Sequence, residues 1–384
     1  MPIILNGTTG EVPVSWATGG RPASPAIGQT GYNTTLNLLE TYTASGWSGD
    51  LAGVISGKNK IINGSMVADQ RNGGASVTTG SGNNYVTDRW AVFTSAASKL
   101  SSQQNQGSVT PPSGFANYLG VTSLSSYSVS ASDMFALRQY IEGYNWSDFS
   151  YGTANAKSAT LSFWVYSSLI GTFGGSFNNY AGTRAYPFSY NIPIANTWTQ
   201  ISITIPGDTG GTWVGASSAG AFFVSFGLGT GSSGTATAGS WQSGYYAQPT
   251  GSVSIVGSSG ATFYITGVQI EPGTFATPFE REIYTTTLDK CCRYYVGAQD
   301  YYFTAGYDPN YTSINSGGVE WDYQMRAVPT VTILAGGMDG HHGYAPTLRG
   351  GSVSNGAPLA FSGAGLRTNV NCSAYVRFTL SAEL

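Results

Sequence analysis

Charged residues are scarce in this sequence of 384 residues. Asp, Glu, Lys and Arg make up 9% of the chain, against about a quarter of an average soluble domain. Because the solvent-facing sides of long helices are normally built from Glu, Lys and Arg, this shortage excludes a mainly helical protein. The net charge is −3, and the 16 Lys and Arg residues are scattered. Nucleic-acid binding needs clustered basic residues to displace counterions from phosphates, so that function is excluded too.

Long apolar runs and cysteines are also lacking. No run of 18 apolar residues is present, and the first residues, MPIILNG, lack the basic flank and apolar core of a signal peptide. We therefore expect no membrane insertion, and folding in a cytoplasm. Three cysteines, Cys291, Cys292 and Cys372, are too few for a disulfide framework in a chain of this length. One of the adjacent pair is expected to be a small core residue, and a bond to Cys372 is the alternative.

Glycine and aromatic residues are abundant instead, with 53 Gly and 13% Phe, Trp and Tyr. Several segments alternate with a period of two, as in a strand that has one buried and one wet face. Leu161, Phe163 and Val165 alternate with Ser162, Trp164 and Tyr166. Similar strands are predicted over residues 135–141, 201–205, 221–228 and 261–270. Gly, Ser, Thr and Asn turns separate them, so the sequence predicts an all-β fold built around a β-sandwich.

Three regions differ in texture. Residues 1–57 contain short strands and prolines that exclude a continuous helix, and they are expected to be ordered by partners or by copies of themselves. Residues 58–283 hold the long alternating strands. Residues 284–384 begin with the one expected helix, near 285–295 with a Thr cap. Short strands follow it at 292–298, 318–325, 330–334 and 374–380.

Residues suited to bond-breaking chemistry are few. A glycan-cleaving enzyme needs two carboxylates that flank the scissile bond. The candidates are Glu280 with Glu282, Glu320 with Asp322, and Asp339. We favour surface-facing strand ends as the position of these acids, and no Gly-x-Ser-x-Gly elbow is present. We therefore expect no enzyme and no organic cofactor.

The two histidines are the strongest metal candidates. His341 and His342 are adjacent, with Asp339 nearby in a Gly-rich stretch. On a strand the two rings would diverge, whereas in a loop they could bind one ion. The alternative is a surface or interface loop without metal. A structural Ca²⁺ elsewhere also stays open, although no Asp-rich loop indicates it.

Several aromatic residues fall where a core position is not forced. Sugars present C–H faces and hydroxyl groups, which match an aromatic ring and short polar side chains. The candidate glycan contacts in turn or loop-rich segments are Trp241, Tyr246, Tyr302, Tyr307 and Tyr344. The alternative is that these rings pack inside the protein or between its copies.

Three stretches carry a resemblance to a known family. They are Asn63–Asn72 (NGSMVADQRN), Tyr85–Trp90 (YVTDRW) and the most specific, Phe263–Glu280 (FYITGVQIEPGTFATPFE). In these motifs the chain resembles phage tail-fibre and receptor-binding virion proteins that carry a carbohydrate-binding-module-like jelly-roll domain. The resemblance implies a virion attachment segment at 1–57, a jelly-roll sandwich at 58–283, and a small C-terminal β-domain at 284–384 that is a candidate receptor-facing tip.

The same resemblance implies a function. The chain would be a tail-fibre protein located in a virion, assembled as a homotrimer and joined to other virion proteins through residues 1–57. It would bind host surface glycans or other receptors without catalysis. Two alternatives remain: a structural head-decoration or baseplate protein that uses the jelly roll as scaffold, and a capsule depolymerase, against which the scarcity of carboxylates argues.

Overall fold

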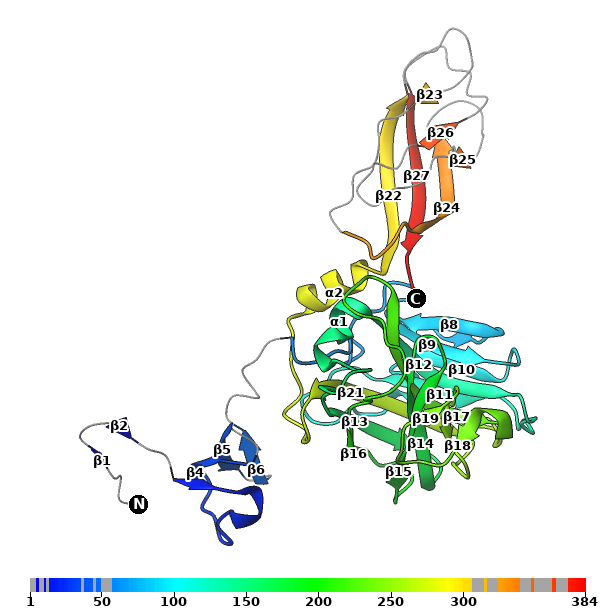
Figure 1. Ribbon diagram of the computed structural model, residues 1–384. Helices are drawn as coiled ribbons and strands as arrows, with labels where there is room; N and C mark the ends of the chain where they lie inside the picture. The colour runs from blue at the N-terminus through cyan, green and yellow to red at the C-terminus, as the bar shows by residue number, and fades with distance from the viewer. Residues whose placement is uncertain are drawn as a thin grey trace.

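The structure of the protein is a computed structural model (Figure 1). It describes the backbone of residues 5–6, 10–11, 14–35, 38–43, 46–49, 57–305, 314–315, 324–338, 347–348, 361–363 and 372–384. Side chains are described for residues 14–35, 39–43, 46–47, 57–300, 324–335 and 377–384. Antiparallel sheets dominate these residues, which confirms the predicted all-β fold.

Near the N-terminus, a four-stranded sheet has its own buried polar cluster. Its strands are β3 (Ser15–Trp16), β4 (Thr30–Asn33), β5 (Leu38–Thr43) and β6 (Gly46–Gly49), with the 3-10 turn η1 (Thr18–Gly20) after β3 and the paired strands β1 (Leu5–Asn6) and β2 (Gly10–Glu11) before it. The buried carboxylate of Glu40 accepts hydrogen bonds from Arg21 (2.7 and 2.9 Å), Trp16 Nε1 (2.5 Å) and Asn33 Nδ2 (3.1 Å). The hydrogen bonds from Arg21 hold the pKa of Glu40 below its ordinary value. This sheet therefore has local contacts of its own, and the expected ordering of residues 1–57 by partners or by copies stays a prediction.

Two antiparallel sheets form the central jelly-roll sandwich. The six-stranded sheet has the order β16 (Thr199–Ile205), β13 (Ala159–Ser167), β21 (Thr262–Pro272), β11 (Leu119–Ser123), β10 (Leu100–Gln104) and β7 (Val77–Thr78). The seven-stranded sheet has the order β19 (Gln242–Ser243), β15 (Arg184–Ile192), β14 (Gly171–Asn179), β17 (Gly220–Thr230), β12 (Met134–Glu142), β9 (Trp90–Thr94) and β8 (Gly82–Thr87). The connections contain α1 (Gly143–Trp146), η2 (Gln106–Ser108), η3 (Ser147–Phe149), η4 (Ser232–Gly234) and the parallel pair β18 (Thr235–Ala236) and β20 (Gln248–Pro249).

The core lies between these sheets and follows the predicted alternation. On β13, Leu161, Phe163 and Val165 are buried in one apolar cluster. From β17 the side chains of Phe222 and Phe226 enter the same cluster, and the Phe163 and Phe226 rings meet edge to face at 5.0 Å. Each fully buried side chain of this size contributes about 1.5–3 kcal/mol of transfer free energy, so the alternation itself specifies which face of each sheet turns inward.

The most specific sequence motif closes the sandwich on itself. Gln269 Oε1 accepts the backbone N–H of Glu280 (2.7 Å), and the buried Glu271 accepts the backbone N–H of Thr277 (2.8 Å). The carboxylate of Glu280 then accepts the backbone N–H groups of Gly57 (2.5 Å) and Asn59 (2.8 Å). These bonds join the two ends of the alternating region, because residues more than 200 positions apart in sequence meet at one carboxylate.

The C-terminal region begins with the expected helix. The helix α2 (Tyr284–Cys292) is followed by a sheet in the order β22 (Tyr295–Ala305), β27 (Cys372–Ser381) and β24 (Thr330–Met338), and by short strands β23 (Ile314–Asn315), β26 (Phe361–Gly363) and β25 (Thr347–Leu348) (Figure 1). The predicted Thr cap is wrong, because Ile283 is the N-cap residue and has no side-chain bond there. Cys291 and Cys292 are both buried, so the core role is confirmed. Neither of these two cysteines forms a disulfide, so the alternative bond to Cys372 is wrong.

Charged side chains join the C-terminal end of the chain to the sandwich. The carboxylate of Glu383 accepts bonds from Arg71 (2.8 Å) and from the fully buried Arg89. The guanidinium of Arg89 also lies 3.5 Å from the ring centroid of Tyr294, just after α2. Arg89 is part of the YVTDRW motif, so this motif holds the C-terminal region in place.

Gln70 makes a second connection across the same junction. Its Nε2 donates to Asp88 Oδ2 (2.8 Å) and to the backbone oxygen of Tyr295 (3.1 Å), and its Oε1 accepts the N–H of Gly297 (3.1 Å). Burial raises the pKa of Asp88 to about 6. The NGSMVADQRN motif, which contains Gln70, is therefore structural.

Among the described residues, none of the helices combines the length and apolar character that a membrane span requires.

Candidate functional site

Aromatic side chains gather on the outer face of the six-stranded sheet. Trp164 and Tyr166 point outward from β13, because they alternate with the core residues of that strand. Trp198 precedes β16, next to Tyr166 in the sheet, and the two ring centroids are 5.5 Å apart. All three side chains are half-buried. We call Trp164, Tyr166 and Trp198 the aromatic platform.

Two buried tyrosines lie beside this platform. Tyr264 of β21 stacks on Tyr166 with 5.3 Å between centroids and 7° between planes. Tyr118 contacts Tyr264 at 5.2 Å and Trp198 at 5.5 Å. Burial raises the pKa of both Tyr118 and Tyr264, which keeps their phenols neutral. The partly exposed rings therefore adjoin neutral aromatic neighbours.

Hydrogen bonds to the segment around η2 fix the rings further. Trp198 Nε1 donates to the backbone oxygen of Thr110 (2.8 Å). The Tyr118 hydroxyl donates to the backbone oxygen of Gln106 (2.6 Å) and accepts the N–H of Val109 (2.8 Å). Because strands and these bonds hold the rings in place, little side-chain entropy remains to be lost when a ligand binds.

Polar groups stand next to the rings. Gln200 is exposed on β16 and lies opposite Trp164 in the β13–β16 register. An amide beside a flat apolar ring supplies both a donor and an acceptor for hydroxyl groups. This combination suits a ligand with apolar C–H faces and hydroxyl edges.

The outer face of the seven-stranded sheet is covered by the chain itself. A Cβ atom at Gly227 would lie 2.0 Å from Gln248 Oε1, and one at Gly174 would lie 2.4 Å from Pro249 Cδ. Ser225, two residues before Gly227 on β17, is fully buried. Residues 245–249 therefore lie directly on this face, and small residues are required under them.

Arg138 shows how complete this covering is. Its side chain on β12 is 2% exposed, and its guanidinium lies 4.0 Å from the ring centroid of Phe93 and 5.5 Å from that of Tyr245. Stacked aromatic rings thus surround the cation in place of water. The pKa of Tyr245 is raised to about 12, mainly by burial.

The structure places Trp241 at one end of the sandwich in an aromatic cluster. Its ring is half-buried and lies 5.6 Å from Trp213, 5.6 Å from Tyr151 and 5.4 Å from Tyr186. Its Nε1 donates to the backbone oxygen of Pro206 (2.7 Å). Three neighbouring rings and a satisfied N–H leave less of Trp241 open, and its glycan contact stays a prediction.

Tyr246 lies in the segment that covers the seven-stranded sheet. It is half-buried, its hydroxyl donates to the backbone oxygen of Ser243 (3.2 Å), and its N–H donates to Asn178 Oδ1 (3.3 Å). Its glycan contact also stays a prediction. The structure does not bring Tyr246 to the aromatic platform, which belongs to the other sheet.

The remaining predicted site residues lie outside the described side chains. Tyr302 is on β22 opposite Tyr375, and only its backbone is described. Tyr307, Tyr344, His341 and His342 lie outside the described residues. Their roles in glycan or metal binding stay predictions. Within the part of the chain that is described, no group of three or more His, Cys, Asp or Glu residues is arranged to hold a metal ion.

The candidate catalytic acids Glu280 and Glu282 have structural partners. Glu280 accepts two backbone N–H groups at the closure of the sandwich. Glu282 pairs with Lys290 and accepts the hydroxyl of Thr287 (3.2 Å). Glu320, Asp322 and Asp339 lie outside the described residues.

Sequence reasoning missed the aromatic platform, although a signal was present. The alternation along β13 already assigned Trp164 and Tyr166 to the outer face. Two large aromatic residues on the solvent-facing side of one strand form an exposed apolar patch, and such patches often mark binding sites. The prediction considered only aromatic residues in turn or loop-rich segments as glycan contacts.

Comparisons with known proteins give only distant likenesses. No protein-family model matches the sequence, and no curated protein matches it. The enzymatically active domain of tailspike protein 4 from bacteriophage CBA120 is similar with a TM-score of 0.28 and 13% identity, over 57% of this chain and 22% of that one. This chain therefore spans less than a quarter of that protein.

Two carbohydrate-binding modules are similar over nearly their whole length. A family 4 module has a TM-score of 0.27 and 15% identity, over 55% of this chain and 98% of that one. The family 11 module of a cellulosomal cellulase of Clostridium thermocellum has a TM-score of 0.27 and 15% identity, over 52% of this chain and 99% of that one. Identities and TM-scores this low do not indicate what the present chain binds.

Proposed function

We propose that this chain is a carbohydrate-binding protein and that the aromatic platform is its binding surface. The observation that carries the proposal is the set of three partly exposed rings, Trp164, Tyr166 and Trp198, held on strands beside the exposed amide of Gln200. Ring faces pack against the C–H groups of a sugar, and the amide bonds its hydroxyls. Several partly exposed rings on one face of a sheet suit an oligosaccharide, because more than one sugar unit can contact them.

The biological setting that we propose is a phage particle. The sequence resemblance to tail-fibre proteins supports a non-catalytic fibre that attaches through residues 1–57 and binds glycans on the host surface as a homotrimer. Three linked copies would raise the avidity of a weak glycan site. The engagement of Glu280 and Glu282 in structural bonds supports a role without catalysis.

A glycan array with the intact protein tests the binding surface. Trp164→Ala and Tyr166→Ala should each weaken binding about tenfold or more, as loss of a central aromatic contact does at other interfaces. Tyr180→Ala is the matched control, because Tyr180 is a 44% exposed aromatic residue just after β14 of the other sheet. Circular dichroism and the thermal midpoint would establish that each variant is folded.

Two outcomes of this test would contradict the proposal. Unchanged binding by both folded platform variants would place the glycan site elsewhere, with Trp241 and Tyr246 as the next candidates. Absence of any glycan binding by the intact protein, together with stable assembly on particles, would favour the scaffold function of a head-decoration or baseplate protein.

Attachment is tested separately. Deletion of residues 1–50 should leave a folded protein, because the bonds of Glu280 to Gly57 and Asn59 join the two ends of the sandwich without residues 1–50. The truncated protein should no longer enter particles, since it lacks the proposed attachment segment. Electron microscopy of particles produced with the truncated protein measures incorporation. Normal incorporation would contradict the role of the N-terminal segment.

A further inference from the structure

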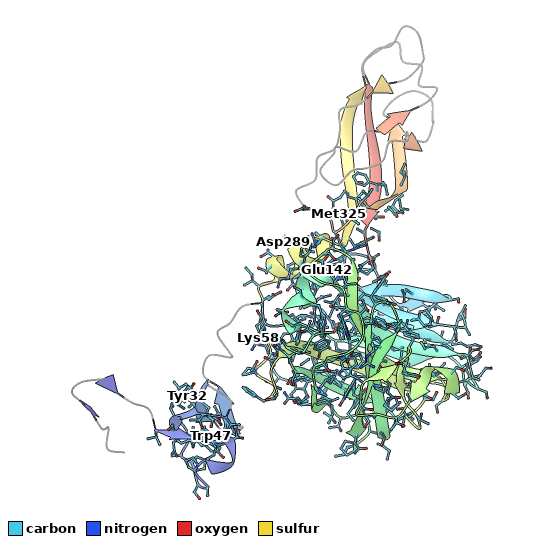
Figure 2. All side chains as sticks on the ribbon, in the orientation of Figure 1. Tyr32, Trp47, Lys58, Glu142, Asp289 and Met325 are labelled. Carbon is cyan, nitrogen blue, oxygen red and sulfur yellow. The ribbon has the colours of Figure 1, made fainter. Side chains whose placement is uncertain are left out.

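A polar cleft lies where the sandwich meets the C-terminal region. Its volume is about 720 Å³, within the range typical of small-molecule sites. The start of the sandwich contributes Lys60, the end of β12 contributes Glu142, and the residues at and after α2 contribute Lys290 and Arg293. Figure 2 labels Glu142, Asp289 and Met325 at this junction. The cleft is separate from the aromatic platform, none of whose residues lines it.

Positive charge predominates in the walls. The lining contains the cations of Lys60, Lys290 and Arg293 and one carboxylate, that of Glu142. Arg293 binds this carboxylate through two hydrogen bonds, of 2.9 and 3.1 Å. Glu142 is therefore neutralised within the wall, and the two lysines supply the remaining charge that faces the cleft.

Both lysines already bind carboxylates that stand outside the lining. Lys60 Nζ lies 2.8 Å from Asp148 Oδ2, and the side chain of Asp148 is 47% exposed. Lys290 pairs with Glu282. Asp148 is half-exposed and Glu282 partly exposed, so each can return to solvent when a ligand carboxylate takes its place on the lysine, and the lysine keeps an anionic partner.

The rim also carries groups that suit a sugar ring. Tyr144 is 60% exposed, and the adjacent Asn145 is half-buried. The backbone that presents them is fixed, since the N–H groups of Gly143 and Tyr144 donate to the oxygens of Ala219 and Ser217 (both 2.9 Å). A Cβ atom at Gly143 would lie 2.0 Å from the backbone oxygen of Gly215, so only glycine permits this close approach.

We propose that this cleft is a second binding site, which takes a carboxylate-bearing saccharide. Lys60 and Lys290 would bind the carboxylate, Tyr144 would stack on the sugar ring, and the Asn145 amide would bond its hydroxyls. The site goes beyond the proposed function: it has its own residues, and it selects for charge, whereas the aromatic platform carries no cation. A ligand here would bridge the sandwich and the segment after α2.

Calorimetric titration of the full chain with sialyllactose, with a glucuronate-containing disaccharide and with neutral lactose tests the site at low ionic strength. We expect at least one acidic probe to bind, lactose to bind at least tenfold more weakly, and added salt to weaken acidic binding. Lys60→Gln and Lys290→Gln should each reduce affinity for the acidic probe about tenfold, as loss of a charge-assisted hydrogen bond does. Lys157→Gln is the control, because it removes the same charge from an exposed residue outside the lining and should leave affinity unchanged.

Several results would overturn the proposal. They are equal binding of lactose and the acidic probes, unchanged affinity in both lysine variants, and equally strong competition by inorganic phosphate, which would show a general anion site. Trp164→Ala separates this site from the platform. If it abolishes acidic binding while the lysine variants do not, the platform is the site for both ligands. If it affects only neutral glycans, the two sites are independent.

Discussion

The outer faces of the two sheets both carry aromatic residues, but these residues differ in how far other parts of the chain cover them. On the seven-stranded sheet, aromatic rings and Arg138 are sealed under residues 245–249, and the strands beneath carry glycine and serine so that the covering segment fits. On the six-stranded sheet, the segment around η2 covers Tyr118 and Tyr264, whereas Trp164, Tyr166 and Trp198 stay half-buried beside them. Aromatic content alone therefore does not mark a binding surface. What distinguishes the two faces is whether the chain covers its own rings.

If the seven-stranded sheet and its adjoining ends are the structural side, the largest effects on stability should come from there. Asp208, which is 2% exposed, accepts bonds from Arg184 Nε (2.8 Å), Trp213 Nε1 (3.1 Å) and the N–H of Gly210 (3.2 Å). Asp208→Ala leaves the guanidinium of Arg184 without its carboxylate and should lower the free energy of unfolding by about 3–5 kcal/mol in urea denaturation. Asp289→Asn, at an exposed helix position, is the control and should change it by less than about 0.5 kcal/mol. A small effect of Asp208→Ala would mean that this end of the sheet is loosely held.

The same pair gives a pH dependence. Burial opposes ionisation of Asp208, but the hydrogen bonds from Arg184, Gly210 and Trp213 and the charge of Arg184 together outweigh it, and the pKa is lowered. A lowered pKa stabilises the folded state above the unfolded value near 4, and this stabilisation is lost as the pH falls through the folded pKa. The difference in stability between the unaltered protein and Asp208→Ala should therefore shrink in strong acid.

The covering segment is tested by enlarging a residue beneath it. Gly174→Val would place side-chain atoms against Pro249 and against the backbone oxygen of Phe188, which lies 2.5 Å from an added Cβ atom. Overpacking of this kind should lower the free energy of unfolding by about 1–3 kcal/mol. Gly215→Ala, where no atom lies within 4 Å of the added Cβ, is the control. Equal stability of the two variants would show that residues 245–249 can lift from the sheet.

The β8–β9 turn of the seven-stranded sheet should respond to pH in the opposite sense to Asp208. Because burial raises the pKa of Asp88 to about 6, the folded state binds a proton that the unfolded state releases between about pH 4 and 6. This group therefore favours folding below pH 6 and costs stability as the pH rises through that value. Urea denaturation at several pH values between 4 and 7 should show this slope in the unaltered protein. Asp88→Asn should flatten it, and an unchanged slope would assign the titration to another group.

The smallest effect on stability should come from the open face. Trp164 is half-buried, so Trp164→Ala removes only part of the apolar contact of a core aromatic residue, and we expect a loss of about 1 kcal/mol or less. Glycan affinity should fall far more, as measured on the array. A large loss of stability without loss of binding would reverse the comparison and make the platform a structural surface.

Strands with strictly alternating apolar residues could be predicted from the sequence. A glycine-rich strand could not. Strands β13, β16, β17 and β21 follow directly from alternating Leu, Ile, Val and Phe. Strand β14 reads GTFGGSFNN and carries no such signal, because Gly174 must be small under Pro249 and Gly175 must be small against the backbone oxygen of Ser225. Contacts with residues far along the chain, which local propensity cannot represent, decide that sequence.

The site was predictable only in part for a related reason. The outward direction of Trp164 and Tyr166 follows from the period of two, but the support from Tyr118 and Tyr264 requires the strand order. The cleft requires still more, since Lys60, Glu142 and Lys290 meet across three separate stretches of sequence. Neither arrangement leaves a local motif.

The closure at Glu280 has a consequence for how the chain can be rebuilt. The carboxylate of Glu280 binds the backbone at Gly57 and Asn59, so the first and last residues of the sandwich lie next to each other. The distance between the chain segments that precede and follow the sandwich is therefore set by this carboxylate. It does not depend on the size of the sandwich that connects them. A different insert with neighbouring termini could be exchanged at this position while the flanking segments keep their spacing.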